Sequence, residues 1–189
     1  MNGKLLRVLQ RLAWRTFPLF AACCILLSAE GVGAGVTTTA RITLLRNQEY
    51  PAALLESIRN AQSSILFSFY LFKVSDTRGN LPGQVVDELV AARRRGVDVT
   101  VYLEKKRGKD PLMTDNRRTA EALNRGGVKV FFDSPNVTSH AKVVVIDSRF
   151  VFLGSHNMTQ GALRHNNELS VLIDSHELAA EVRSYLDRL

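Results

Sequence analysis

Residues 139–147 read Ser-His-Ala-Lys-Val-Val-Val-Ile-Asp, and the apolar part of this stretch decides the fold. Residues 143–146 are apolar at both odd and even positions. Because successive side chains of a β-strand point to opposite faces of the sheet, such a strand is buried on both faces. Residues 65–72, Ile-Leu-Phe-Ser-Phe-Tyr-Leu-Phe, repeat the pattern. The two stretches therefore predict a sheet that is covered by helices on both sides.

Segments typical of strands and of helices alternate on either side of this stretch. We expect strands at residues 41–45, 64–72, 97–103, 128–132, 140–147, 150–154 and 168–173. We expect helices at residues 51–62, 82–95, 115–125 and 176–189. Pro51 and Pro82 lie near helix starts, and Gly96 lies at a helix end. The alternation predicts the α/β class, with a layered α-β-α sandwich around a central mixed sheet.

The composition is that of one folded domain. Of the 189 residues, 46% are hydrophobic and 23% are charged, which excludes wholesale disorder and a polytopic membrane protein. The formal net charge of +7 favours acidic partners, such as nucleic acid or anionic lipid headgroups.

The first 34 residues have the pattern of a targeting segment. Residues 1–29 contain no acid; four basic residues come first, and residues 17–29 form an apolar run. That run is shorter than the about 20 residues of a membrane-spanning helix, so we expect a signal peptide at 1–34 and export to the periplasm or the medium. The alternatives are an uncleaved N-terminal membrane anchor, a lipoprotein modified at Cys23 and an organelle transit peptide.

Residues 35–189 then form the expected functional domain. Both cysteines, Cys23 and Cys24, precede it, so it has no thiol for a disulfide or a thiolate metal site. Without the four basic residues and Glu30 of the first segment, the net charge falls from +7 to +4. The domain therefore remains basic, and packing of its core has to hold it together.

Polar side chains that could take part in catalysis lie in and after the central stretch. His140 and Lys142 are two residues apart and share one face of the predicted strand. Ser155 and Asn157 repeat this spacing after Gly154. Each residue alone is more often a solvated surface group. The combination of His-x-Lys-x-x-x-x-Asp with a following Gly-Ser-x-Asn is much rarer, and it indicates a site where the sheet ends.

With these motifs the sequence resembles the phospholipase D superfamily, and in particular its small, single-motif bacterial endonuclease branch. Glu168 fills the position of the acidic residue that follows the second motif. Met158 stands where an aromatic residue is common, and His156 occupies a variable position. Neither departure affects a residue that the chemistry requires.

The resemblance implies a metal-independent phosphodiesterase. A neutral His140 would attack phosphorus and form a phosphohistidine, and a second, protonated histidine would donate to the leaving oxygen. Lys142, Asn157 and Ser155 would hold the phosphoryl oxygens, and Glu168 would orient the imidazole. Asp147 has the opposite strand parity to His140, so we assign it, together with Gly154, a structural role.

The sequence contains no second His-x-Lys, whereas the reaction uses two histidines. A homodimer with one shared site on its two-fold axis would supply both. We expect no cofactor and no metal, because there is no His-Glu-x-x-His, no cysteine ligand and no paired-Asp motif. His156, His165 and His176 are dispersed along the chain.

The motifs do not distinguish nucleic acid from phospholipid as the substrate. The basic loop after residue 103 favours nucleic acid; its candidate phosphate-binding residues are Lys105, Lys106, Arg107 and Lys109. Phospholipid is the alternative substrate, with Leu112 and Met113 as apolar contacts, although residues 35–189 contain no Trp. A third hypothesis is a non-enzymatic phosphate- or nucleic-acid-binding module, which the complete motif set argues against.

Overall fold

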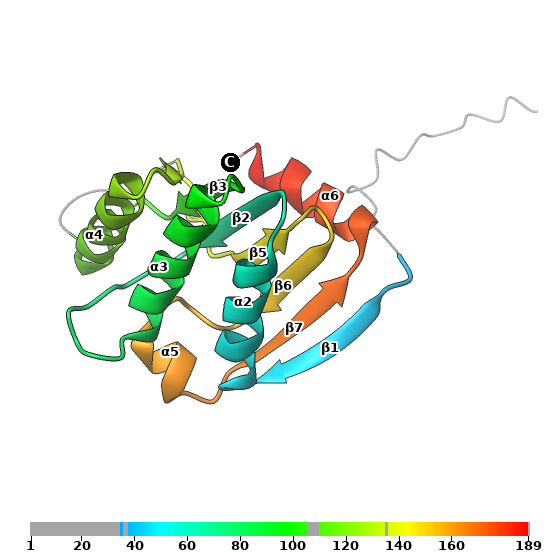
Figure 1. The fold of residues 1–189 in the computed structure, drawn as a ribbon, viewed down its shortest axis with the longest axis horizontal. Helices are drawn as coiled ribbons and strands as arrows, with labels where there is room; N and C mark the ends of the chain where they lie inside the picture. The colour runs from blue at the N-terminus through cyan, green and yellow to red at the C-terminus, as the bar shows by residue number, and fades with distance from the viewer. Residues whose placement is uncertain (1–34, 36–37, 106–109, 135, 189) are drawn as a thin grey trace, which may run out of the picture. The chain divides into compact units, whose positions relative to one another are not determined.

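The computed structural model describes residue 35 and residues 38–105, 110–134 and 136–188 (Figure 1). The expected signal peptide or anchor at 1–34 lies outside the described residues. Of the helices in the described part of the chain, none has the length and apolar character needed to cross a bilayer.

The described residues form seven strands and five helices. The strands are β1 (Arg41–Arg46), β2 (Ser64–Phe69), β3 (Asp98–Leu103), β4 (Lys129–Phe132), β5 (Lys142–Ile146), β6 (Phe150–Gly154) and β7 (Leu169–Asp174). The helices are α2 (Glu49–Asn60), α3 (Leu81–Arg94), α4 (Pro111–Arg125), α5 (Gln160–Arg164) and α6 (His176–Leu186).

The strands form one sheet in the order β1-β7-β6-β5-β2-β3-β4. The pairs β2/β3 and β3/β4 are parallel, and the other four pairs are antiparallel. The mixed sheet with helices on both faces confirms the predicted α/β sandwich. The strand with the decisive sequence, β5, lies in the middle of the sheet beside β2, where both of its faces are covered.

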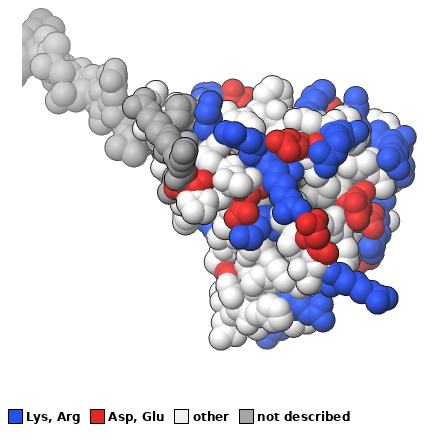
Figure 2. Space-filling view, turned by 90° about the vertical axis from the view of Figure 1, so that its left-hand side faces the viewer, with Lys and Arg blue, Asp and Glu red and all other residues white. Residues whose placement is uncertain are grey.

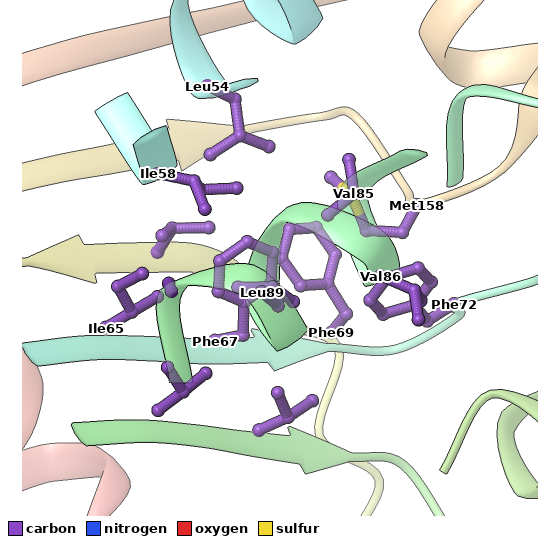
Figure 3. Close-up of a cluster of buried hydrophobic side chains, with 14 of the residues drawn as sticks. Leu54, Ile58, Ile65, Phe67, Phe69, Phe72, Val85, Val86, Leu89 and Met158 are labelled. Carbon is purple, nitrogen blue, oxygen red and sulfur yellow. The ribbon is translucent and has the colours of Figure 1, made fainter. Parts of the chain in front are cut away.

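The two faces of the sheet carry unequal cores. The larger core lies under α2 and α3, where Phe67 and Phe69 of β2 meet Leu54 and Leu89 (Figure 3). The smaller core includes Leu66, Val143, Val145 and Val151 of the sheet with Ala179 and Leu186 of α6. Adjacent residues of β2 thus belong to different cores, as the apolar run predicts.

Several boundaries differ from the sequence expectation. Helix α4 begins at Pro111 instead of residue 115, because the Asp110 side chain accepts a hydrogen bond from Leu112 N and caps an earlier first turn. Strand β2 ends at Phe69 instead of residue 72, although Phe72 still forms an isolated bridge to Met158. The short helix α5 was not expected.

The boundary that matters most for the site is the start of β5. We expected His140 on this strand. The strand begins at Lys142, so His140 lies in the segment that precedes it. Strand β6 likewise ends at Gly154, so Ser155 and Asn157 do not continue it. These polar residues therefore lie in loops just beyond the strand ends, and contacts within the loops set their positions.

Part of the α6 side of the sheet is apolar and uncovered. Leu44 and Leu153 both pair with Val171, which places the three side chains on one face. Leu44 is 50% exposed and Leu153 45% exposed. Ile42 and Leu169 extend the same face along β1 and β7. We call Ile42, Leu44, Leu153 and Leu169 the open face.

Candidate active site

His140 and Lys142 lie together at the edge of the sheet. The Lys142 Nζ atom is 3.3 Å from His140 Nδ1 and 3.4 Å from Nε2, and it donates to the His140 carbonyl at 3.0 Å. An ammonium has only donors, so it can bond to a ring nitrogen only where that nitrogen carries no proton, and the two similar distances do not select one of the two nitrogens. Burial lowers the pKa of Lys142 below its ordinary value, and the Glu168 carboxylate opposes this shift.

Tyr70 is a neighbour of His140 that the sequence analysis missed. The centres of the two rings are 4.5 Å apart with an interplanar angle of 61°, and Lys142 Nζ lies 5.7 Å from the centre of the tyrosine ring. The backbone N–H of Tyr70 donates to Ala141 O at 3.1 Å. In sequence Tyr70 is one more large residue of an apolar run, so no signal marks it as part of a site.

Ser155 and Glu168 meet beside this pair. The Ser155 hydroxyl donates to the Glu168 carboxylate and accepts from Leu169 N at 3.1 Å. Asn166 Nδ2 donates to the other carboxylate oxygen at 3.1 Å. These are the hydrogen bonds of the Glu168 carboxylate to described residues, and the predicted bond from Glu168 to the imidazole stays a prediction.

Gly154 permits the close approach of β6 and β7 just before Ser155. A Cβ atom on this residue would lie 2.5 Å from Ser170 Cα, closer than real Cβ atoms come. Any side chain here would push the two strands apart at the point where Ser155 meets Glu168. The glycine therefore acts on the site through backbone packing.

Asn157 is positioned by the residue that follows it. Met158 N donates to Leu71 O at 3.0 Å, and Lys73 N donates to Met158 O at 2.9 Å, which ties the segment to the chain after β2. Asn157 Oδ1 is buried and, among the described residues, has no hydrogen-bond partner. Buried polar atoms are usually paired, and unpaired ones concentrate at sites of function.

His156 faces the interior and supports Glu168 indirectly. Its ring stacks on Tyr50 with centres 4.3 Å apart, and Nε2 lies 3.0 Å from Asn47 O. That carbonyl only accepts, so Nε2 carries the proton and Nδ1 accepts from Ser170 Oγ at 2.7 Å. Burial lowers the pKa of His156 and keeps the ring neutral.

Asn47, which His156 holds, bonds to the backbone of Glu168 on both sides. Asn47 N donates to Glu168 O at 3.0 Å, and Glu168 N donates to Asn47 Oδ1 at 2.9 Å. Asn47 has φ of 46°, a left-handed conformation that asparagine tolerates better than most residues. The sequence analysis places His156 at a variable position of the motif and does not single out Asn47, so only the fold shows their role.

Asp147 lies at the opposite end of β5 from His140. Its carboxylate accepts hydrogen bonds from the backbone N–H groups of Gln62, Ser63 and Ser64 and from the Ser63 hydroxyl. Burial raises the pKa of Asp147, but these hydrogen bonds outweigh it and hold the pKa below its ordinary value. The carboxylate joins the start of β2 to the end of β5, far from the imidazole.

Of the predicted phosphate-binding loop, Lys105 is described and exposed, whereas Lys106, Arg107 and Lys109 lie outside the described residues. Lys73 and Arg117 line a cavity of about 570 Å³ near the start of α4. Figure 2 shows Lys and Arg side chains interspersed with Asp and Glu on the face turned to the viewer. Ion pairs such as Lys73–Asp115, at 3.0 Å, neutralise part of the positive charge.

The described residues contain no group of three or more His, Cys, Asp or Glu side chains that is placed to hold a metal ion. His156 is committed to Asn47 and Ser170, and His176 Nδ1 lies 2.9 Å from Ser148 O. The side chains of two of the three dispersed histidines, His156 and His176, thus have other partners in the fold.

A mixed sheet of this order, with an imidazole and an ammonium side by side at its edge, defines a phospholipase D-like α/β domain. Residues 54–189 match the family described as "Cardiolipin synthase, PLD-like domain". The chain belongs to this family, and through it to the phospholipase D superfamily.

Individual relatives agree with this assignment. The chain is 32% identical over 152 residues to cardiolipin synthase A of Serratia proteamaculans, which is 75% of this chain and 29% of that protein. Nuc of Salmonella typhimurium, a phospholipase D family member, superposes with a TM-score of 0.66 at 24% identity, over 79% of this chain and 93% of Nuc. NucT from Helicobacter pylori gives 0.61 at 20% identity, over 79% and 95%. The chain spans less than a third of the length of the curated relatives it matches.

Proposed function

We propose that the protein is a metal-independent phosphodiesterase that acts through a phosphohistidine, with nucleic acid as its substrate. The contact of His140 with Lys142 carries this proposal. It places an imidazole 3.3 Å from a cation, and these two groups can serve as the nucleophile and the phosphoryl-oxygen ligand that cleavage needs.

The reaction divides into two displacements. An unprotonated nitrogen of His140 forms a bond to phosphorus while the bond from phosphorus to the leaving oxygen breaks, and a second histidine, as imidazolium, gives its proton to that oxygen. Water then attacks the phosphohistidine, the same second histidine takes the water proton, and the P–N bond breaks. Lys142 and the amide of Asn157 stabilise the equatorial oxygens in both steps. Ser155 and Glu168 line the site beside them.

The second histidine would come from a second copy of the chain. The open face adjoins the site, because Leu153 is followed by Gly154 and Ser155, and Leu169 follows Glu168. Contiguous exposed apolar side chains on a soluble domain mark an interaction surface. A two-fold dimer across this face would bury it and would bring two copies of His140 toward one axis.

This interface gives a testable prediction. Replacing Leu153 with glutamate should shift the chain to a monomer in analytical ultracentrifugation and lower the activity at least about tenfold, because it places a charge in a desolvated interface. Ala52→Glu, an equally charged change on the exposed side of α2, is the control and should leave both unchanged. A wild-type chain that is monomeric and fully active contradicts the shared site.

Two observations favour nucleic acid as the substrate. Nuc and NucT match this domain over more than nine-tenths of their own length, whereas the match covers less than a third of the cardiolipin synthases, and a small single-domain chain fits the endonuclease branch that the sequence resembles. Lys73 and Arg117 also line the cavity at the start of α4, and Lys73 N bonds to Met158 O, next to Asn157. There the two cations would contact flanking phosphates. Phospholipid is the second candidate, because the matching family and the 32% identical relative are cardiolipin synthases.

The deciding experiment incubates the protein with plasmid DNA, RNA and phosphatidylglycerol or phosphatidylcholine vesicles, all in excess chelator. We expect nicked plasmid and intact lipid, with cleavage falling steeply as salt rises because phosphate contacts release counterions. Release of headgroups or formation of a transfer product from the vesicles, while the plasmid stays intact, would assign the protein to phospholipids. Loss of all activity in chelator would contradict the metal-independent reaction.

A further inference from the structure

Glu104 is a buried carboxylate next to the candidate site that the proposed reaction does not use. It directly follows β3, is 2% exposed, and its Oε2 accepts a hydrogen bond from Ser139 N at 2.7 Å. Burying a carboxylate is costly unless its oxygens are hydrogen-bonded, and bonds to a charged acceptor are the strong ones. Ser139 is the residue before His140, so this bond fixes the chain one residue from the imidazole.

The backbone around Glu104 is itself held by a buried amide. Asn116 of α4 is 0% exposed, and its Nδ2 donates to Glu104 O and to Tyr70 O at 3.0 Å each. Its Oδ1 accepts from Phe72 N at 2.8 Å. One side chain therefore links the end of β3, which carries Glu104, with the segment that carries Tyr70.

These contacts enclose His140 from two sides. The carboxylate of Glu104 holds the backbone before it, and the ring of Tyr70 packs against its imidazole with centres 4.5 Å apart. Both supports are fixed to the same Asn116 side chain. His140 itself precedes β5, so no sheet ladder bond of its own secures it.

We propose that Glu104 is a positioning residue, which holds the His140 imidazole in line for attack through the backbone N–H of Ser139. The inference rests on the proposed function for its effect on activity. Displacing the imidazole by about 1 Å lowers the rate of the chemical step on the order of a hundredfold, while the affinity of the protein for its substrate stays the same. The length of the Glu104 side chain, and the presence of an acceptor at its end, are what the position requires.

Three substitutions separate these requirements. Glu104→Gln keeps the length and one acceptor oxygen, Glu104→Asp keeps the charge but is one methylene shorter, and Glu104→Leu keeps the volume without an acceptor. With bis(4-nitrophenyl) phosphate as the probe, we expect Gln to retain kcat within about threefold, and Asp and Leu to lower kcat about 10- to 100-fold with KM within about twofold.

The matched control is Val101→Ala, which removes buried volume from the same strand away from the loop. It should lower Tm while kcat per folded site stays at the wild-type value, because a loss of stability alone does not move the imidazole. Equal kcat for wild type, Asp and Leu, with Glu104→Asp folded, overturns the proposal. A loss of kcat in Gln as large as that in Asp also overturns it, because a side chain of the right length with an acceptor oxygen would then not be sufficient.

A second readout is independent of activity. The aromatic ring of Tyr70 shifts the NMR signals of the His140 ring protons, and the bond to Glu104 slows exchange of the Ser139 amide hydrogen. In Glu104→Asp the His140 signals should move toward those of a free histidine, and Ser139 should exchange faster. If the wild type cleaves no diester while these NMR changes occur, the proposed function fails and the positioning contact stands; unchanged signals refute the contact itself.

Discussion

Replacing His140 with alanine is expected to reduce phosphodiester cleavage at least about 10⁴-fold, because the variant lacks the nucleophile that forms the covalent intermediate. Folding should be unaffected, since the imidazole lies at the edge of the sheet and its contacts are with Lys142 and Tyr70. Initial rates with plasmid and with bis(4-nitrophenyl) phosphate measure the loss, and circular dichroism checks the fold.

The same variant tests whether one site uses two histidines. In an equal mixture of wild-type and His140→Ala chains that exchange at random, a shared site leaves about one quarter of the activity, because wild-type homodimers alone are competent. Independent sites would leave about half. Purified heterodimers, obtained with two different affinity tags, give a sharper answer: full or half activity in them excludes the shared site.

Replacing Asp147 with alanine should give the largest loss of stability. The change removes the acceptor of three backbone N–H groups and one hydroxyl, and hydrogen bonds to a charged group contribute about 1.5–3 kcal/mol each, with partial compensation by water. Asp147 also has a positive φ angle of 52°, which alanine tolerates poorly. We expect a loss of about 3–4 kcal/mol in the free energy of unfolding.

Chemical denaturation measures this loss, and Asp147→Asn is the matched variant. Asparagine keeps one acceptor oxygen and tolerates the left-handed conformation, so it should lose less than half as much. Both variants should retain wild-type kcat per folded molecule, because the carboxylate lies at the far end of β5 from His140. A large fall in kcat without a loss of stability would place Asp147 in the chemistry and contradict the structural role.

The sign of the pH dependence follows from the lowered pKa of Asp147. A carboxyl group whose pKa is lower in the folded state stabilises the fold fully above its unfolded pKa, and this contribution disappears as the pH falls through the folded value. The stability difference between the wild type and Asp147→Ala should therefore be constant above about pH 5 and shrink at lower pH. A difference that grows in acid would contradict the assignment.

The sequence was sufficient for the fold class because the evidence for it is local. Residues 143–146, apolar on both parities, become β5 in the middle of the sheet. Helix boundaries were less secure, because a capping residue such as Asp110 starts a helix a turn before the apolar periodicity becomes visible. The start of β5 was placed two residues too early, since strand propensity cannot show where pairing with β2 stops.

The motif residues were found from the sequence because they lie close together along the chain and carry functional side chains. Tyr70, Asn47 and Glu104 were missed for the opposite reason. They come from segments far from residue 140, and each is unremarkable among its sequence neighbours. Contacts at long sequence separation bring them to the site. Tyr70 and Glu104 are held by the hydrogen bonds of Asn116, and Asn47 is held by its bonds to Glu168 and His156.

The amino-acid sequence by itself determined the layers of the sandwich and the residues of the motif, because side-chain direction along a strand repeats every two residues and follows from the local backbone. The tertiary structure alone decided the strand order. It also placed α6, and no other helix of the described residues, on the second face, so that the open face lies beside Ser155 and Glu168. It also decided what surrounds His140. Strand pairing depends on the total burial and hydrogen bonding of the whole chain, and no local pattern contains that information.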